Sequence, residues 1–236
     1  MNNEISFEYS GKEILLANEA LLRNYNRWIV RQFATYWKKN ALNQSVLDFG
    51  AGVGTLSVLF KEMTGQQPLT LEIDGTQRDI LHERGFVATE TLDELPDGID
   101  FVYSSNVLEH IEDDVAALVS IRKKMSSGGR LALYVPAFKS LWTKMDDNVG
   151  HRRRYTRETL QSRLSEAGFA VESIAYSDPI GFVLSKAFKF IGTESGNPSA
   201  RSLLLFDRLL FPTSAVLDGL TRHSFGKNVL AFAHPK

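Results

Sequence analysis

The stretch Val46-Leu-Asp-Phe-Gly-Ala-Gly-Val-Gly-Thr55 decides the predicted fold. Its apolar start, from Ser45 to Phe49, suits a short buried strand, and a helix is predicted over 55–63. Three glycines lie between them, and glycine lets a backbone turn sharply and approach a ligand closely. The spacing is G-x-G-x-G; a dinucleotide site would usually place its third glycine at the position of Thr55.

An acidic residue follows at the distance expected for a nucleoside site. The second predicted strand, Leu69–Ile73, contains Glu72, about 20 residues beyond the glycine turn, where a carboxylate accepts hydrogen bonds from ribose hydroxyls. Asp74 is a second candidate, and Glu72 is favoured because it lies at the strand end. The alternative is that the glycine turn only packs a strand against a helix.

The rest of the chain alternates between strand and helix patterns. This spacing predicts an α/β, Rossmann-like fold with a mainly parallel sheet flanked by helices. The further strands are predicted at 85–88, 99–104, 130–135, 169–176 and 229–233, and the further helices at 18–39, around 80–81, at 111–125 (ended by Ser126–Gly129) and at 160–167.

We expect one domain, 1–236, with two additions. Residues 1–40 form an N-terminal helical cap, and 178–227 form a helical insertion or lid. The insertion has apolar patches at 180–191 and 203–217 around a Gly/Ser/Pro-rich loop, 192–199, and it is too short to build a core of its own.

Composition excludes several classes of protein. The 236 residues include 27 Lys and Arg, 28 Asp and Glu and no Cys, for a formal charge of −1. This balance argues against a general nucleic-acid binder, and the lack of Cys excludes thiol chemistry and Cys-bound metals. With no apolar run of membrane-spanning length and no secretory signal in the first 20 residues, we expect a cytoplasmic protein.

Four segments together resemble the class I S-adenosylmethionine-dependent methyltransferases. They are VLDFGAGVG, LEID, DFVYSSNVLEHIEDD and MSSGGRLALYVPA, and the resemblance runs from about Tyr25 to Phe169. It implies a seven-stranded sheet with an antiparallel last strand and S-adenosylmethionine bound over the strand ends.

The resemblance also implies roles for individual residues toward the donor. Asp48 anchors the first loop near the amino group, and Glu72 holds the ribose. A helix-packing role is the alternative for Tyr25. The remaining donor residues are Gly50, Ala51, Gly52 and Gly54 beneath the methionine, Ile73 beside Glu72, Thr91 and Leu92 at the adenine, Ser105 and Asn106 on the methionyl side, and Tyr25 with Arg27 at the carboxylate.

The segment from Asn106 to His110 resembles the VLEH motif of small-molecule O-methyltransferases. Residues 106, 109 and 110 lie within one turn, so their side chains can converge, and His110 is a candidate catalytic base. In some of those enzymes a divalent metal is associated with this motif. Because Asn106 stands where a carboxylate would help, we predict no metal. The alternative is that Glu109 and His110 only orient the loop.

The segment from Asp146 to Tyr155 resembles the D…GHxRRYT pattern of a bacterial methyltransferase subgroup linked with surface-glycan and lipid pathways. Guanidinium groups pair with carboxylates and phosphates, so an anionic acceptor is predicted here. A solvated charged surface is the alternative. The residues assigned are His151 and Tyr155 as catalytic, and Arg153, Arg154 and Trp142 as acceptor-binding.

In the insertion, Lys186 and Lys189 share one face of the apolar segment 180–191. This pattern allows peripheral contact with a membrane or a lipid-linked acceptor. A lid over the site and a homodimer contact are the alternatives.

The sequence therefore predicts transfer of a methyl group from S-adenosylmethionine to a small or lipid-/glycan-linked acceptor, at oxygen. One rival is an NAD(P)-dependent oxidoreductase, against which the glycine spacing and the VLEH segment count. The other is a non-catalytic S-adenosylmethionine-binding partner or regulatory protein.

Overall fold

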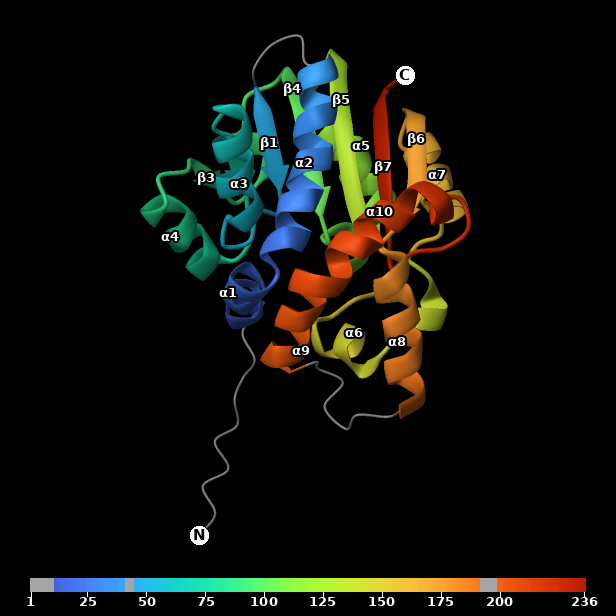
Figure 1. Ribbon diagram of the computed structural model, residues 1–236. Coiled ribbons are helices and arrows are strands. Elements are labelled where there is room, and N and C mark those ends of the chain that lie inside the picture. The colour runs from blue at the N-terminus through green and yellow to red at the C-terminus, as the bar shows by residue number, and fades with distance from the viewer. Residues whose placement is uncertain (1–10, 41–44, 192–198) are drawn as a thin grey trace.

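Seven strands form one mixed sheet in the order β3-β2-β1-β4-β5-β7-β6 (Figure 1). The computed structural model describes residues 11–40, 45–191 and 199–236. β7 is antiparallel to both neighbours and the other six strands run parallel, which confirms the predicted fold. The strands are β1 (Val46–Phe49), β2 (Leu69–Leu71), β3 (Ala88–Thr89), β4 (Ile99–Ser105), β5 (Met125–Pro136), β6 (Phe169–Ser177) and β7 (Asn228–Pro235).

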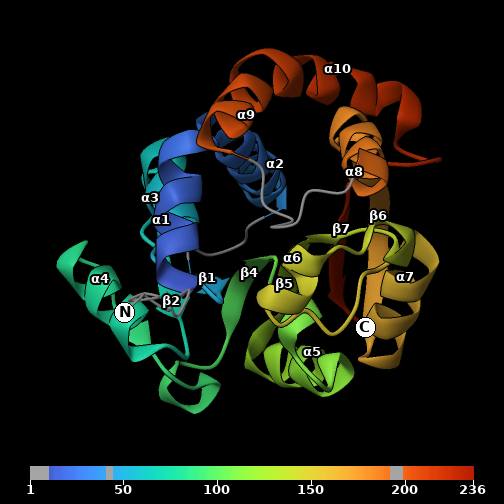
Figure 2. The ribbon, with the colours of Figure 1, turned by 90° about the horizontal axis from the view of Figure 1, so that it is seen from below.

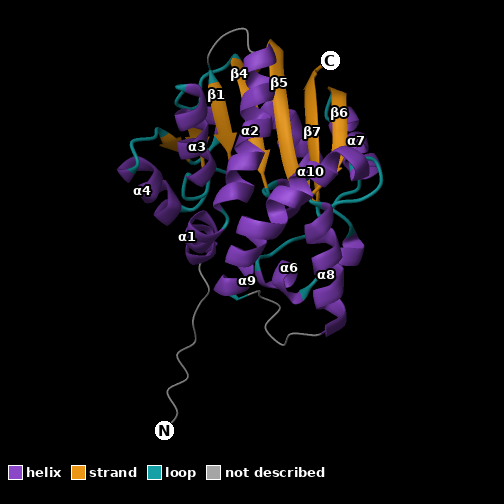
Figure 3. Ribbon diagram, in the orientation of Figure 1, coloured by secondary structure: helices purple, strands orange, loops and turns teal. Residues whose placement is uncertain are grey.

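Helices cover both faces of this sheet (Figure 3). On one face, α2 (Arg23–Asn40) and α3 (Thr55–Thr64) bury Phe33 and Phe60 against Tyr103 of β4. On the other, α5 (Asp114–Lys124) and α7 (Arg157–Glu166) join the larger apolar core, which includes Leu118 and Leu160. Successive residues of a strand point to opposite faces, which explains why alternate positions of β4 belong to different cores.

The predicted elements differ from the structure at three places. The helix expected at 18–39 is two helices, α1 (Gly11–Leu21) and α2, separated at Leu22. The third strand lies slightly later than predicted. Residues 125–129, expected only to end a helix, begin β5, because Met125 pairs with Ile99 of β4 and extends the sheet.

The carboxyl ends of the parallel strands share one edge of the sheet, at the bottom of Figure 1. Seen from below in Figure 2, helices from both ends of the chain surround this edge. They are α1, α6 (Lys144–Asn148), α8 (Pro179–Ile191), α9 (Ala200–Leu205) and α10 (Phe211–Thr221), with α4 (Gly75–Glu83) beside β2. Loops after parallel strands meet at this edge, which is where open α/β sheets bind ligands.

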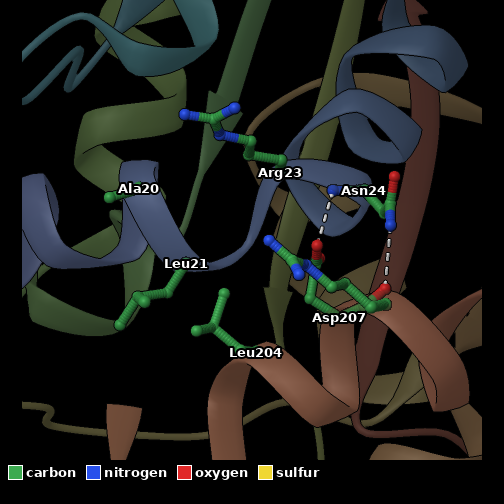
Figure 4. Close-up of a pocket in the computed structure, with 7 residues that line it drawn as sticks. Ala20, Leu21, Arg23, Asn24, Leu204 and Asp207 are labelled. Carbon is green, nitrogen blue, oxygen red and sulfur yellow. Dashed lines mark hydrogen bonds between the residues drawn. The ribbon is translucent and has the colours of Figure 1, made fainter. Parts of the chain in front are cut away.

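The predicted insertion contacts the predicted N-terminal cap through Asp207 (Figure 4). Asp207 lies in a π-helical turn, Phe206–Leu210, and its carboxylate accepts hydrogen bonds from the backbone N–H groups of Asn24 (3.0 Å) and Tyr25 (2.9 Å). These N–H groups belong to the first turn of α2, which has no intrahelical acceptor for them. A hollow of ≈ 300 Å³ beside this contact is lined by residues of α1, α2, α9 and the π-helical turn.

Both additions are helical in the described residues. The first ten residues, in which no secretory signal was expected, and positions 192–198 of the predicted loop lie outside that part of the chain. Among the described residues, no helix has the length and hydropathy needed to cross a membrane.

Candidate functional site

The glycine loop connects the carboxyl end of β1 to α3 in a conformation that glycine favours. Gly50 and Gly54 have φ values of 77° and 85°, in the left-handed region. A Cβ at Gly50 would collide with Val107, and one at Gly54 would lie 2.7 Å from Leu81. The loop is therefore constrained both by its dihedral angles and by its packing against the segment after β4.

Glu72 links this loop to the end of β2. The side chain is buried, and its Oε2 accepts a hydrogen bond from the Gly52 N–H (2.8 Å) while Oε1 accepts one from the Asp74 N–H (3.0 Å). Asp74 instead caps α4, accepting from the N–H groups of Thr76 (2.8 Å) and Gln77 (3.1 Å). Each carboxylate oxygen has two lone pairs, so Glu72 keeps acceptor capacity for a ligand, whereas Asp74 is used by its helix.

Asp48 lies beneath the loop at the end of β1. It is buried, and the Ser57 hydroxyl of α3 donates a 2.5 Å hydrogen bond to it. Burial raises the pKa of Asp48 to about 7, despite that hydrogen bond. The observed contact therefore joins β1 to α3.

Three further groups of predicted donor residues lie along the same edge. Ile73 is 77% exposed, although it directly follows the buried Glu72. Thr91 closes a capping box with Glu94, and the adjacent Leu92 packs against the larger core. Ser105 and Asn106 end β4, with Asn106 at a φ of 55° and its side-chain amide donating to the Ser105 hydroxyl (3.2 Å).

The two predicted residues of α2 have different surroundings. Tyr25 packs edge-on against Tyr134 and Phe211, and its hydroxyl accepts a hydrogen bond from the Asn228 amide (3.1 Å). Arg27 is exposed and pairs with Glu62 of α3 at 3.6 Å. The structure thus places Tyr25 among buried polar groups, while Arg27 lies on the outer helical layer.

Glu109 is the most unusual group on the other half of the edge. It lies in a short 3-10 helix, Leu108–His110, directly after β4, with 0% of its surface exposed. Neither carboxylate oxygen has a hydrogen-bond partner among the described residues. Burial raises the pKa of Glu109 to about 8, and the nearby Arg154 offsets this only in part.

Two histidines adjoin Glu109. The His151 Nε2 lies 3.8 Å from the Glu109 Oε1, and the rings of His151 and His110 meet edge-to-face with centroids 4.7 Å apart. Partial burial, then the proximity of His151, lowers the pKa of His110, so its imidazole is neutral at pH 7. Ligand atoms of Glu109, His110 and His151 all lie within 4.8 Å of one another, a group that could hold a metal ion.

Asp146 orients His151. Its carboxylate is 2.7 Å from His151 Nδ1 and accepts hydrogen bonds from Arg154 Nε (2.7 Å) and Nη2 (3.0 Å). Burial opposes ionisation of Asp146, but the contacts with His151 and Arg154 outweigh it and hold the Asp146 pKa well below its usual range. Trp142 lies nearby, its ring 6.4 Å from that of His151 and its indole N–H bonded to Asp147.

The basic segment Arg152–Arg154 is paired within the chain. Arg153 makes an ion pair with Asp114 (2.9 Å) and donates to the Glu112 carbonyl (2.6 Å), while Arg154 donates to Asp146 and to the Ala137 carbonyl. Arg152 donates to the His110 carbonyl (3.0 Å). These contacts join the loop after β5 to the segment after β4. Arg153 and Arg154 thus already have carboxylate partners within the chain, and their role in binding an anionic acceptor stays a prediction.

Tyr155 also has a structural partner. Its ring is 2% exposed and its hydroxyl donates a 2.8 Å hydrogen bond to Asp114. Burial and the Asp114 carboxylate raise the pKa of Tyr155 well above its usual value. Of the three residues expected to be catalytic, the geometry brings together His110 and His151 and leaves Tyr155 as a buried donor.

The comparisons with known proteins agree with this architecture. A family model described as a methyltransferase domain matches residues 19–174. This chain belongs to that methyltransferase family. The predicted enzyme class and the cofactor, S-adenosylmethionine, are confirmed, and the oxidoreductase alternative is set aside. No curated protein matches the sequence.

Solved structures share the fold of this methyltransferase at low identity. An S-adenosylmethionine-dependent methyltransferase from Archaeoglobus fulgidus is 21% identical, with a TM-score of 0.60 and coverage of 94% of this chain and 99% of that one. Geranyl diphosphate C-methyltransferase from Streptomyces coelicolor is 10% identical (TM-score 0.58, coverage 86% and 79%). Mitomycin 7-O-methyltransferase is 16% identical (TM-score 0.53, coverage 90%), and this chain spans 54% of its length.

Sequence reasoning did not assign roles to three carboxylates of the methyltransferase. They are the buried residues Glu109, Asp146 and Asp114. For Glu109 the sequence left open whether its role is catalytic or structural, and Asp146 entered only as the first residue of a motif. The signal for Asp146 is its place five residues before His151 in a tight turn. No comparable signal exists for Asp114, whose partners Arg153 and Tyr155 lie about 40 residues away along the chain.

Proposed function

We propose that this methyltransferase transfers a methyl group from S-adenosylmethionine to a hydroxyl oxygen of a small or lipid-/glycan-linked acceptor. The observation that carries the proposal is the division of one sheet edge into two sites. The glycine loop and Glu72 form the first, over β1 and β2, and the cluster of the buried Glu109, the half-buried His151 and the exposed His110 forms the second, after β4 and β5.

In the donor half, we assign the ribose hydroxyls to Glu72 and the methionine portion to the loop 50–54. The exposed Ile73 offers an apolar surface to the adenine, beside Thr91 and Leu92. Ser105 and Asn106 border the methionyl side. Asp48 supports the loop from below through Ser57, and Tyr25 borders the acceptor half through Asn228.

Methylation at oxygen is supported by the histidines. A hydroxyl nucleophile has a high pKa and must lose its proton as the methyl group is transferred, so a positioned base assists. Nδ1 of His151 contacts the Asp146 carboxylate, so Nε2 is the nitrogen that faces Glu109. We assign His151 as the base and His110 as its neighbour at the acceptor.

A lipid-linked acceptor is supported by an apolar stripe along α9 and α10. Leu205, Leu209, Val216 and Leu220 are more than half exposed, and Val216 and Leu220, four residues apart in α10, lie on one face of that helix. The exposed charged residues of the segment 200–222 are Arg201, Arg208 and Arg222, all basic; of its acidic residues, Asp207 is buried and Asp218 is half-buried. An apolar stripe with basic flanks fits the surface of an anionic bilayer.

Calorimetric titration with S-adenosylhomocysteine, followed by a screen of hydroxylated, carboxylated and amino acceptors, tests the function. Saturable donor-product binding and turnover only with hydroxyl acceptors are expected. Turnover of amines but not alcohols would contradict methylation at oxygen. No turnover with any acceptor, despite donor binding, would favour the non-catalytic alternative.

Sedimentation with vesicles tests the lipid contact. Binding to phosphatidylglycerol-containing vesicles is expected to fall about tenfold in Val216→Glu/Leu220→Glu, since each change removes apolar burial and adds a repelled charge. Val87→Glu, at a residue beside β3 that is also more than half exposed, is the control. If the double variant instead abolishes a concentration-dependent dimer in light scattering, the stripe is a homodimer contact.

A further inference from the structure

The carboxylate of Glu109 is the least satisfied polar group at the acceptor edge. It has no exposed surface, and both oxygens lack a hydrogen-bond partner among the described residues. A buried carboxylate without partners is costly, and such groups are normally paired or bound to a metal. The geometry therefore calls for a ligand that interacts with both oxygens or with one of them strongly.

His151 lies at the spacing of a second ligand. Its Nε2 is 3.8 Å from the Glu109 Oε1, which is too long for a hydrogen bond. Two donor atoms that share one divalent cation at about 2.1 Å each are about 3.4 Å apart in tetrahedral geometry. The observed separation is close to that value, so a small side-chain movement brings both atoms onto one ion.

His151 is also held as metal-binding histidines are. Such a histidine commonly donates its second ring N–H to a carboxylate, which fixes the tautomer and directs the other nitrogen at the metal. Here Asp146 is 2.7 Å from His151 Nδ1, and Arg154 in turn binds Asp146. This arrangement reserves Nε2 of His151 for the side facing Glu109.

His110 completes the donor set. It follows Glu109 in the same turn, and ligand atoms of all three residues lie within 4.8 Å of one another. His110 is the exposed member, and its ring already meets that of His151 edge-to-face. Two imidazoles and one carboxylate suit Zn²⁺, Mn²⁺ or Fe²⁺ better than Mg²⁺, which prefers oxygen ligands.

We propose that Glu109, His110 and His151 bind a divalent transition-metal cation, with Asp146 as the residue that positions His151. The sequence predicted no metal because Asn106 stands where a carboxylate would help. The structure instead brings in His151, 45 residues beyond Asn106 along the chain. A bound cation would occupy Nε2 of His151, so this histidine would then act as a ligand and not as the base. The cation would instead lower the pKa of the acceptor hydroxyl by Lewis-acid activation, and the proton would pass to solvent. This catalytic role rests on the proposed function, whereas binding itself does not.

Cation binding tests the site directly. The full chain is treated with chelator, dialysed, and titrated with Zn²⁺ by calorimetry and with Mn²⁺ by electron paramagnetic resonance. We expect one equivalent to bind, and the affinity to fall at least 30-fold in Glu109→Gln and His151→Gln. Asp146→Asn should weaken binding about tenfold, since a misplaced second hydrogen bond typically lowers metal affinity 10- to 100-fold.

His82→Gln, at an exposed histidine near the end of α4, is the matched control and should bind the cation as the original chain does. A rise in melting temperature on adding Zn²⁺ to the original chain, and its absence in His151→Gln, gives a second readout for variants of altered stability. Lack of saturable binding of both cations, or equal affinity in His151→Gln, overturns the site. Titration of the same samples with S-adenosylhomocysteine keeps this outcome separate from a failure of the donor function.

Discussion

The two halves of the carboxyl edge are stabilised in different ways. In the donor half, backbone N–H groups and glycine dihedral angles define the loop 50–54, and Glu72 lies only 20 residues from its partner Gly52. In the acceptor half, buried ionisable groups from β4, β5 and the following loops meet, as in the pair of Asp146 and Arg154. Local chain geometry thus dominates the first half and long-range electrostatics the second.

The sharpest test of this difference is Arg154→Ala. The pair with Asp146 is almost fully buried, and removing one partner leaves an uncompensated charge, so the free energy of unfolding should fall by about 3 kcal/mol in urea denaturation. Affinity for S-adenosylhomocysteine should stay within twofold. The double variant Asp146→Asn/Arg154→Met should regain part of the stability. Unchanged stability with a selective loss of acceptor affinity would instead restore Arg154 to an acceptor-binding role.

Glu72→Ala tests the donor half. It removes the acceptor of the Gly52 N–H and the proposed ribose contacts, so donor affinity should fall about 100-fold, as expected for two charge-assisted hydrogen bonds. Calorimetry with S-adenosylhomocysteine measures this loss. Glu83→Ala, at an exposed position of α4, serves as control. Full donor affinity in Glu72→Ala would mean that another residue holds the ribose.

The pH dependence of stability tests a third region, the insertion, through Asp218 of α10. Burial, together with the nearby Asp178, raises the pKa of Asp218 to about 7. The folded state therefore binds its proton more tightly than the unfolded state, and stability is lost as pH rises from about 4 to about 7. Asp218→Asn should reduce this loss by about 1 kcal/mol, a value discounted for partial exposure.

Urea denaturation of the original chain and of Asp218→Asn at pH 4.5, 6 and 7.5 measures the effect on the free energy of unfolding. Asp48, whose pKa is also raised by burial, contributes with the same sign in both chains and leaves a residual slope. Parallel curves for the two chains would show that Asp218 titrates in the folded protein as it does in the unfolded chain.

The smallest effect is expected for Arg27→Ala. Its pair with Glu62 is exposed, and such pairs contribute less than about 1 kcal/mol. Donor affinity and stability should both be nearly unchanged. A tenfold loss of donor affinity would restore the sequence-based prediction that Arg27 reaches the donor carboxylate.

The sequence by itself determined the parts that depend on neighbouring residues. A strand, glycine turn and helix form from a contiguous segment, so β1, the loop and α3 could be predicted, and alternating strands and helices predicted the sheet. The place of Glu72 in the site could be predicted because the strand ends of a parallel sheet meet at one edge. The antiparallel last strand followed from the family resemblance.

Only the tertiary structure decided the acceptor half. In the sequence the three arginines look like an anion site, but their partners lie 8 to 42 residues away. The role of a charge depends on which opposite charge packs against it. Likewise, the break between α1 and α2 lies where Asp207 bonds to the first turn of α2, 183 residues from Asn24. The proximity of the buried Glu109 to His151 arises from that same packing, which local sequence patterns do not encode.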